Sequence, residues 1–319
     1  MKIGTLQLAN PVILAPMAGI TDLPYRLIMK RFGAALVFTE MISANGLHYG
    51  GTGSGDLLRS VPAERPLGVQ LFGDDPQRLA AAARQVEANA DLIDLNCGCP
   101  MRKIVGDGAG SALLRDPAKV ACIVSAVRRA TALPLTIKLR SGWDADSRNY
   151  LEVARLAVAE GVDAVTLHPR TRAQMFGGRA DWSEIAALKQ AVAVPVIASG
   201  DLFTARDAVN VLQETGCDAV MVARGGYGNP WLIRQILDRL AGRPEHHPAA
   251  TERLALAAEH LELFHDTFGP AKTLVHMRKH LCWYTHGLAN AAAFRQHVNQ
   301  SRSVAELRNL LSGFAAAAA

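Results

Sequence analysis

Two cysteines at the end of a short apolar run form the segment of this chain with the clearest potential for chemistry. The run Leu92–Leu95 is short and apolar enough to be a buried parallel strand. Residues 96–100 follow it directly and read Asn-Cys-Gly-Cys-Pro. In α/β proteins, catalytic groups lie where such strands give way to loops. A thiol there, in a loop shaped by glycine and proline, could act as a proton donor, a nucleophile or a metal ligand.

The metal alternative is the weakest of the three. A structural zinc site needs four ligands, and Cys97 and Cys99 have no second Cys or His pair at ligand spacing. We therefore predict that the protein has no metal site.

Polar side chains also end or interrupt neighbouring apolar runs. Gln70 lies inside one run, Lys138 and Arg140 lie along another, and His168 ends a third. Taken singly, each has an ordinary explanation, because Lys138 could pair with a carboxylate and Gln70 or His168 could satisfy a core hydrogen bond. Polar groups at the ends of successive strands are costly to bury unless they bind something. Together they therefore indicate a binding site.

Glycine-rich turns follow the last two apolar runs, at residues 199–201 (Ser-Gly-Asp) and 223–226 (Ala-Arg-Gly-Gly). In eight-stranded barrels, loops at these places commonly bind phosphate, because glycines let backbone N–H groups approach the anion. Arg224 adds a positive charge, and the first run ends in Ala15–Gly19, where backbone could support a flat group. This arrangement suits a flavin mononucleotide (FMN) across a barrel mouth. The glycine-rich stretch Gly46–Gly55 lacks the ending of a P-loop, and we expect a mobile rim loop there.

The elements that must position these groups alternate regularly. Apolar runs that indicate strands cover Pro11–Met17, Leu36–Ile42, Leu67–Gly73, Leu92–Cys99, Leu135–Gly142, Ala164–Arg170, Val194–Asp201 and Ala219–Gly225. Helical stretches separate them, and three begin at clear caps: Asp75 and Asp116, each before a proline, and Thr204, with Asp207 three residues later. Eight strands alternating with helices favour a closed (β/α)8 TIM barrel over an open sheet, and we expect it to end near Gly226.

The chain changes character after the predicted barrel. Residues 243–248 (Arg-Pro-Glu-His-His-Pro) are typical of a linker, and residues 251–314 have a helical pattern without strand signals. We therefore divide the chain into a flavin-binding catalytic barrel, residues 1–242, and a smaller all-α domain, residues 243–319.

Positive charge gathers in the helical part. Residues 272–308 hold six Lys or Arg and one acidic residue, so this segment carries the same net charge, +5, as the whole chain. On the expected helix, Lys272, His276, Lys279 and Trp283 share one face. A basic face that also carries an aromatic ring suits an RNA backbone. A solvated helix face explains the same pattern equally well.

Composition narrows the setting. The 319 residues are 50% hydrophobic and 20% charged, which suits one barrel of roughly 250 residues and an additional segment. No apolar run approaches the ~20 residues that span a bilayer, and no secretory h-region is visible near Met1. With five cysteines, an odd number, free thiols in a reducing compartment are the simplest interpretation. We expect a cytoplasmic protein with no membrane association and no obligate protein partner.

Four motifs together resemble one known family. They are residues 15–22 (Ala-Pro-Met-Ala-Gly-Ile-Thr-Asp), 96–100 (Asn-Cys-Gly-Cys-Pro), 138–143 (Lys-Leu-Arg-Ser-Gly-Trp) and 168–172 (His-Pro-Arg-Thr-Arg). This set is similar to the tRNA-dihydrouridine synthases, and most similar to their bacterial B-type branch. The resemblance covers essentially the whole chain, including residues 268–272 (Phe-Gly-Pro-Ala-Lys) of the helical part.

The resemblance implies an activity and a set of residue roles. The implied activity is flavin-dependent reduction of the uracil C5=C6 bond in the D-loop of tRNA, with FMN as cofactor, NADPH as electron source and Cys99 as general acid. The residues implied to bind the flavin are Pro16, Met17, Ala18, Gln70, Lys138, His168, Ser199, Gly200, Asp201, Ala223 and Arg224. Those implied to bind the uracil or the rest of the tRNA are Asn96, Arg140, Arg170, Arg172, Lys272, Arg278 and Lys279.

Three positions depart from the pattern that is usual in this family. Ser199 stands where asparagine is usual, Ala223 where glycine is usual, and Pro169 where glycine is common. Gly200 and Arg224 remain in place, so phosphate binding is expected to survive. Proline removes one backbone N–H, so we expect the loop at residue 169 to be stiffer and to lose one backbone contact.

The chemistry of uracil agrees with a thiol at position 99. The C5=C6 bond is conjugated to the C4 carbonyl, so C6 accepts hydride and C5 then needs a proton. A thiol with an ordinary pKa of about 8.5 is mostly protonated at neutral pH, which makes Cys99 a suitable donor.

Two other functions stay open. A flavin enzyme acting on a free pyrimidine, of the dihydroorotate or dihydropyrimidine dehydrogenase type, would not need the basic helices. A non-catalytic tRNA-binding factor would not need Cys99, Lys138 and His168 together.

Overall fold

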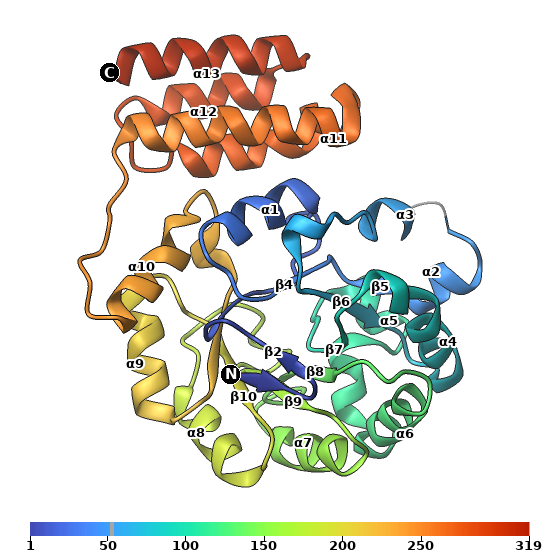
Figure 1. Cartoon of the computed structure of the whole chain (residues 1–319). Helices are drawn as coiled ribbons and strands as arrows, with labels where there is room; N and C mark the ends of the chain where they lie inside the picture. The colour runs from blue at the N-terminus through green and yellow to red at the C-terminus, as the bar shows by residue number, and fades with distance from the viewer. Residues whose placement is uncertain (52–53, 319) are drawn as a thin grey trace.

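Eight parallel strands close into a barrel, as the alternating sequence pattern predicts. The computed structural model describes residues 1–51 and 54–318 (Figure 1). The barrel strands are β3 (Val12–Leu14), β4 (Val37–Phe38), β6 (Leu67–Phe72), β7 (Leu92–Cys97), β8 (Leu135–Arg140), β9 (Ala164–His168), β10 (Val196–Ser199) and β11 (Ala219–Val222). Their order around the ring is β3-β11-β10-β9-β8-β7-β6-β4. A parallel bridge between Ile13 and Leu36 closes the ring.

The strands are shorter than the predicted runs, chiefly at their C-terminal ends. Gly200 and Asp201, which we had included in a strand, have φ values of 112° and 57°. Positive φ cannot continue a β-ladder, so both residues belong to the loop after β10. The second predicted run is divided into β4 and β5 (Ile42–Ser43), which both pair with β6.

Helices surround the barrel on its outer side. They are α1 (Leu23–Arg31), α2 (Ala44–His48), α3 (Ser54–Leu57), α4 (Pro76–Val86), α5 (Arg102–Gly106), α6 (Pro117–Arg128), α7 (Tyr150–Ala159), α8 (Trp182–Ala191), α9 (Ala205–Thr215) and α10 (Trp231–Leu240). Short 3₁₀-helices cover Pro62–Glu64, Glu87–Asn89, Gly110–Arg115 and Arg224–Gly226. The prediction of a rim loop at Gly46–Gly55 was partly wrong, because α2 and α3 occupy the two ends of this stretch. Residues 52–53, between them, lie outside the described residues.

The predicted helix starts are confirmed in atomic detail. Asp75 Oδ1 accepts a hydrogen bond from the Arg78 N–H (2.9 Å), and Asp116 caps α6 in the same way (3.0 Å). Thr204 and Asp207 form a reciprocal capping box at the start of α9. These caps satisfy N–H groups that the first helical turn leaves without partners.

A short hairpin closes one end of the barrel. It consists of β1 (Lys2–Ile3) and β2 (Leu6–Gln7), which pair antiparallel (Figure 1). Ile3 and Leu8 are fully buried and pack with inward-facing residues of the strands, such as Ile197 and Ala219. The opposite end, where the strands finish, is therefore the end that can hold a ligand.

Three helices follow the barrel: α11 (Ala250–Tyr284), α12 (Ala291–Gln300) and α13 (Val304–Ala318). Gly269, with φ 77°, and Pro270 break α11 into two segments, because neither the positive φ nor the missing N–H fits a helix interior. The apolar sides of these helices form a core that also includes Ile28 of α1 and Trp231 of α10. Within the described residues, no helix combines the length and hydropathy needed to cross a membrane.

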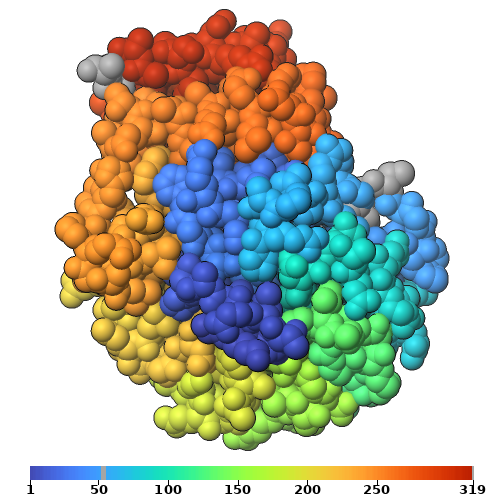
Figure 2. All heavy atoms as spheres, viewed as in Figure 1, coloured from blue at the N-terminus to red at the C-terminus, as the bar shows by residue number. Residues whose placement is uncertain are grey.

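The helical part is docked firmly on the barrel. Figure 2 shows the orange and red helices seated against the blue N-terminal part of the chain. The rings of Tyr227 and Trp283 stack with centroids 4.2 Å apart. Arg31 of α1 forms a two-point ion pair with Glu259 of α11 (2.9 Å for one of its two contacts). We call this contact zone between α11 and the barrel the seam.

Candidate active site

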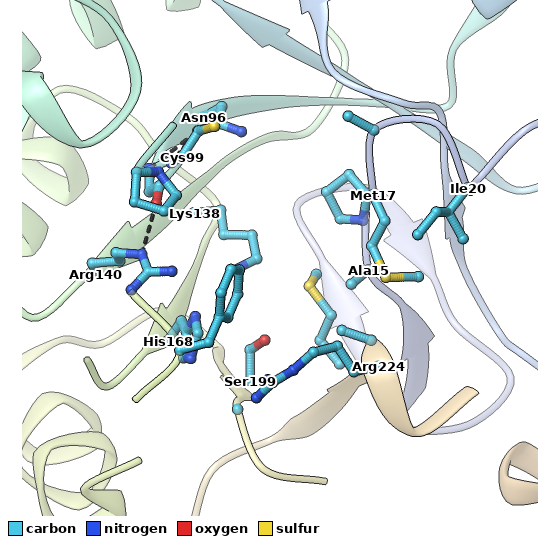
Figure 3. Close-up of a pocket in the computed structure, with 18 of the residues that line it drawn as sticks. Ala15, Met17, Ile20, Asn96, Cys99, Lys138, Arg140, His168, Ser199 and Arg224 are labelled. Atoms are coloured by element: carbon cyan, nitrogen blue, oxygen red, sulfur yellow. Dashed lines mark hydrogen bonds between the residues drawn. The ribbon is translucent and has the colours of Figure 1, made fainter. Parts of the chain in front are cut away.

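A cavity of about 360 Å³ opens at the C-terminal ends of the barrel strands (Figure 3). Its volume falls within the range of small-molecule sites. The predicted site residues that line it are Pro16, Met17, Ala18, Gln70, Asn96, Cys99, Lys138, Arg140, His168, Ser199, Gly200, Asp201, Ala223 and Arg224. The predicted site residues that do not line it are Arg170, Arg172, Lys272, Arg278 and Lys279.

One wall of the cavity presents backbone and apolar side chains. It is formed by the loop that follows β3, residues 15–20. The carbonyl oxygen of Met17 accepts hydrogen bonds from the N–H groups of Ile20 and Thr21, both at 3.0 Å, which closes the loop into a tight turn. In Figure 3, Ala15 and Met17 lie across the cavity from Cys99. A flat ring could therefore rest on one wall while the thiol faces it from the other.

The Cys99 loop is held from two directions. Asn96 Oδ1 accepts hydrogen bonds from the N–H groups of Gly98 (3.1 Å) and Cys99 (2.9 Å). The Cys99 carbonyl oxygen accepts from both the N–H (3.0 Å) and the hydroxyl (2.9 Å) of Ser111. Gly110 has φ 61°, and a Cβ there would lie 2.7 Å from that carbonyl oxygen, so the loop requires glycine at this position.

The Cys99 thiol is set up to hold its proton. Burial raises the pKa of the Cys99 thiol, and this effect outweighs the Met101 N–H and the charges of Arg140 and Lys138, which lower it. The group is therefore a thiol, not a thiolate, at neutral pH, and it can donate a proton.

Lys138 and His168 line the cavity, and burial lowers the pKa of both side chains. Burial and the nearby Arg140 lower the pKa of Lys138 to about 8. Lys138 takes part in none of the ion pairs found among the described residues. Burial, together with Lys138 and three arginines, lowers the pKa of His168 well below its usual value, so His168 is neutral.

The tautomer of His168 follows from one contact. Arg170 Nη1 lies 3.2 Å from His168 Nε2. A guanidinium group can only donate, so Nε2 accepts and the ring proton of His168 lies on Nδ1.

The turn after β10 is built around Asp201. Its carboxylate accepts two hydrogen bonds from Arg170 (2.9 and 2.7 Å) and one from Arg224 (3.3 Å). Burial opposes ionisation, but these contacts outweigh it and hold the pKa of Asp201 below its usual value. Gly200 packs so closely that a Cβ would lie 2.8 Å from the His168 ring. The side chain of Arg224 remains 34% exposed and is the cation available at this end of the cavity.

Two arginines that we had assigned to the substrate have other contacts in the structure. Arg170 is 2% exposed and lies behind His168 and Asp201, where it holds both. The guanidinium of Arg172 lies over the Trp143 ring, 4.6 Å from its centroid. Neither side chain lines the cavity, so Arg170 positions the lining residues instead of forming part of the lining.

Arg140 lines the cavity and also links its loops. Its Nε donates to the Gly98 carbonyl oxygen (2.8 Å), and Nη1 donates to the carbonyl oxygens of Thr171 (3.0 Å) and Met175 (2.7 Å). The guanidinium therefore ties the Cys99 loop to the loop after β9.

The basic residues of α11 lie mostly at the seam. Their contacts are Lys272 with Asp56, Lys279 with the Gly19 carbonyl oxygen, and Arg278 with the Ser301 carbonyl oxygen. The predicted face that carries Lys272, Lys279 and Trp283 exists, but it packs toward the barrel, whereas we expected an open surface. Arg278 is bound inside the helical part.

Sequence reasoning missed several residues of the site. Phe176 lines the cavity, with the Arg140 and Arg224 guanidinium groups 5.5 and 5.0 Å from its ring centroid. Phe203 and Tyr227 also line it, and no sequence signal distinguishes a loop aromatic of this kind. Asp94 lies beneath the cavity and accepts a hydrogen bond from Gln70 (2.6 Å). Its signal was available, because a carboxylate inside an apolar strand is unusual.

Comparison with known proteins places the chain in a family. A sequence model of the dihydrouridine synthase family matches residues 13–319. tRNA-dihydrouridine synthase B of Pseudomonas aeruginosa is 43% identical over 303 residues, which cover 94% of this chain and 91% of that protein. A probable tRNA-dihydrouridine synthase of Rickettsia conorii is 41% identical over 304 residues, with the same coverage of both chains.

Solved structures confirm the barrel. Morphinone reductase superposes with a TM-score of 0.55 at 15% identity, over 79% of this chain and 91% of its own. At this identity the likeness concerns the fold alone. The match to the family model and the identity to its curated members lead to one conclusion: the chain belongs to the dihydrouridine synthase family of oxidoreductases.

Proposed function

We propose that this protein reduces the C5=C6 bond of uridines in the D-loop of tRNA, with FMN as cofactor, NADPH as electron source and Cys99 as proton donor. The observation that carries the proposal is the protonated Cys99 thiol, held across a cavity from an apolar wall, in a chain of this family. The five free thiols suit a reducing compartment, and we propose that the protein acts in the cytoplasm.

The lining of the cavity fits a flavin nucleotide. The wall at residues 15–18 offers an apolar surface for a ring system. Lys138, which lines the cavity and whose pKa burial lowers to about 8, would face the polar edge of that ring. Arg224 would hold the phosphate, next to a turn where a Cβ on Gly225 would lie 2.1 Å from a backbone oxygen. When bound and reduced, the flavin supplies the hydride that C6 of uracil accepts.

The protein supplies the proton and the orientation. As negative charge develops toward C5, the Cys99 S–H bond breaks and its proton passes to C5. The thiolate left behind lies near Arg140 and Lys138, whose charges lower the pKa of Cys99 and so favour the thiolate. Solvent then restores the proton. General-acid transfer of this kind contributes roughly 10²- to 10⁴-fold to the rate.

Contacts outside the cavity bring the RNA to it. The target uracil must leave its stack, which costs a few kcal/mol. Lys272 keeps half of its side chain exposed although it pairs with Asp56 across the seam, so it can also approach a phosphate. We propose that Lys272 binds the RNA at the seam, and that Arg172 does so at the rim. Such binding weakens steeply with salt.

The proposal is tested by nucleoside mass spectrometry on unmodified tRNA incubated with the protein, FMN and NADPH. We expect a gain of two hydrogens on uridine, and Cys99→Ala should lower the single-turnover rate by about 10²- to 10⁴-fold. Cys122→Ala, which removes an exposed thiol, is the matched control and should leave the rate unchanged.

Three results would contradict the proposal. A rate for Cys99→Ala equal to that of the parent protein would remove the thiol from the mechanism. No product from a flavin-loaded protein would favour a free pyrimidine as substrate. Binding of tRNA without flavin and without turnover would leave only a binding factor.

A further inference from the structure

A line of buried hydrogen bonds runs from Asp94 to the backbone of Cys99. Gln70 Nε2 donates to Asp94 Oδ2 at 2.6 Å, and Asn96 Nδ2 donates to Gln70 Oε1 at 2.8 Å. Asn96 Oδ1 in turn accepts from the N–H groups of Gly98 and Cys99. The three side chains are 1%, 1% and 9% exposed for Asp94, Gln70 and Asn96. We call these residues the relay.

The location of Asp94 in the barrel needs an explanation. On β7, Ile93 and Leu95 pack with the helices, so Asp94 and Asn96 point to the inside of the barrel. The inward-facing positions of a barrel are usually filled with branched apolar side chains. Burial of a carboxylate at such a position costs free energy unless the group is hydrogen-bonded, so we ask what its hydrogen bonds hold in place.

The groups at the two ends of the relay fix which atom donates and which accepts in each of its hydrogen bonds. Burial raises the pKa of Asp94 to about 6, although bonds from Gln70 and Thr136 hold it down, so the group is a carboxylate at neutral pH and can only accept. At the other end, backbone N–H groups can only donate. Each amide between them therefore has one orientation that satisfies all of its partners.

We propose that Asp94 is a positioning residue, whose carboxylate fixes the orientation of the Gln70 and Asn96 amides and thereby the conformation of the Cys99 loop. Asp94 does not touch the cavity itself. Its catalytic consequence rests on the function proposed above, whereas its effect on the loop can be measured without substrate or flavin.

Asp94→Asn tests the direction of the relay with almost no change in shape. Thr136 donates its hydroxyl proton to Asp94 Oδ1 at 2.6 Å, and a flipped amide that made this hydroxyl the acceptor would leave that proton without its buried partner, so we expect the new amide nitrogen to face Gln70. Gln70 must then turn its oxygen toward residue 94 and its nitrogen toward Asn96. Asn96 cannot accept from Gln70 and from the Gly98 and Cys99 N–H groups with the same geometry, so the loop loses its anchor.

Hydrogen exchange followed by mass spectrometry reads this anchor directly. The peptide covers residues 95–101, because the first two residues of a peptide do not retain label; Pro100 has no N–H, so the amides that report are those of Cys97 and Met101 and the two that the relay anchors, Gly98 and Cys99. We expect their exchange to become at least about tenfold faster in Asp94→Asn. Thr136→Val is the matched control: it removes a hydrogen bond from Asp94 but leaves the direction of the relay unchanged, so exchange should stay as in the parent.

A double variant makes the test specific. In Asp94→Asn with Asn96→Asp, the carboxylate moves to the other side of Gln70, where it accepts from Gln70 and from both backbone N–H groups. Every bond of the relay is then restored in the reversed direction, so protection of the Gly98 and Cys99 amides should return. The single change Asn96→Asp places two carboxylates around Gln70, and should be worse than the double variant.

The outcomes separate cleanly. The inference is overturned if Asp94→Asn leaves the two amides protected, if Thr136→Val exposes them equally, or if the double variant fails to restore them. Should Asp94→Asn not fold, Gln70→Met cuts the relay one link further along and must produce the same loss of protection. If exchange behaves as expected but no uridine is reduced by the parent protein, the relay stands and the proposed function fails.

Discussion

Gly228→Ala is expected to displace the helical part from the barrel while leaving the barrel strands, and the polar side chains at their ends such as Lys138 and His168, in place. Gly228 has φ 62°, and an ideal Cβ there would lie 2.4 Å from the Trp283 carbonyl carbon and 2.6 Å from the Tyr284 nitrogen. Ordinary Cβ contacts begin near 3.4 Å. Both obstructing atoms are backbone, which cannot rotate away as a side chain can. The distance between the Gly228 loop and the end of α11 must therefore grow, and α11 must move away by roughly 1 Å.

The size of the effect has two parts. A non-glycine residue in the left-handed region costs roughly 1–2 kcal/mol, and overpacking of a tight contact costs roughly 1–3 kcal/mol more. Gly242→Ala isolates the first part, because Gly242 has φ 67° and nothing within 4 Å of its Cβ. The difference between the two variants in free energy of unfolding should therefore be about 1–3 kcal/mol.

Function should respond more sharply than stability. A misplacement of about 1 Å far from the chemistry can lower a rate by about 10²-fold. We expect that loss in the single-turnover reduction of tRNA by Gly228→Ala, with FMN affinity within about twofold of the parent protein, measured by fluorescence titration. If Gly228→Ala and Gly242→Ala behave alike in unfolding and in tRNA reduction, a rigid, closely packed seam is refuted.

Three further predictions concern single side chains. Burial raises the pKa of Asp22 to about 7 in the folded protein, so its ionisation lowers the free energy of unfolding as the pH rises from about 4 to 7. In denaturant unfolding, Asp22→Asn should therefore be about 2–4 kcal/mol more stable than the parent protein at pH 8. The two proteins should be equally stable at pH 4. Glu64→Gln breaks a buried ion pair with Arg26 (2.5 Å) and should cost about 3–5 kcal/mol in the same assay, whereas Glu262→Gln, in an exposed pair, should cost at most about 1 kcal/mol. Arg140→Lys cannot reach all three carbonyl oxygens that Arg140 binds, so single-turnover reduction should fall at least about tenfold while FMN affinity is retained.

The fold could be predicted from the sequence because its signals are local. Each strand is a short apolar run, and caps such as Asp75 and Thr204 mark helix starts within four residues of chain. Strand ends were predicted too far along, since the turn at Gly200 depends on close packing against the His168 ring. That contact joins residues far apart in sequence, and local patterns carry no signal for it.

The site could be predicted where the barrel topology alone brings residues together. Cys99, Lys138 and His168 meet because parallel strands all end at the same edge. Residues whose role depends on docking were less predictable. Lys279 was expected to face RNA freely, but it donates to the Gly19 carbonyl oxygen, 260 residues away. Arg170 carries the charge expected of a substrate ligand, yet its partner is the buried side of Asp201.

The loop between β3 and α1 has a consequence for how this protein can change over evolutionary time. Its first residues, at Ala15 and Met17, form a wall of the cavity, while Gly19 is bound by Glu40 of the barrel and Lys279 of α11. One short segment thus belongs to two structural units that are otherwise far apart in the chain. A substitution in α11 near Lys279 therefore also affects the loop that forms the cavity wall. If the helical part were exchanged between relatives, we expect the chimera to be functional only when this loop is exchanged with it.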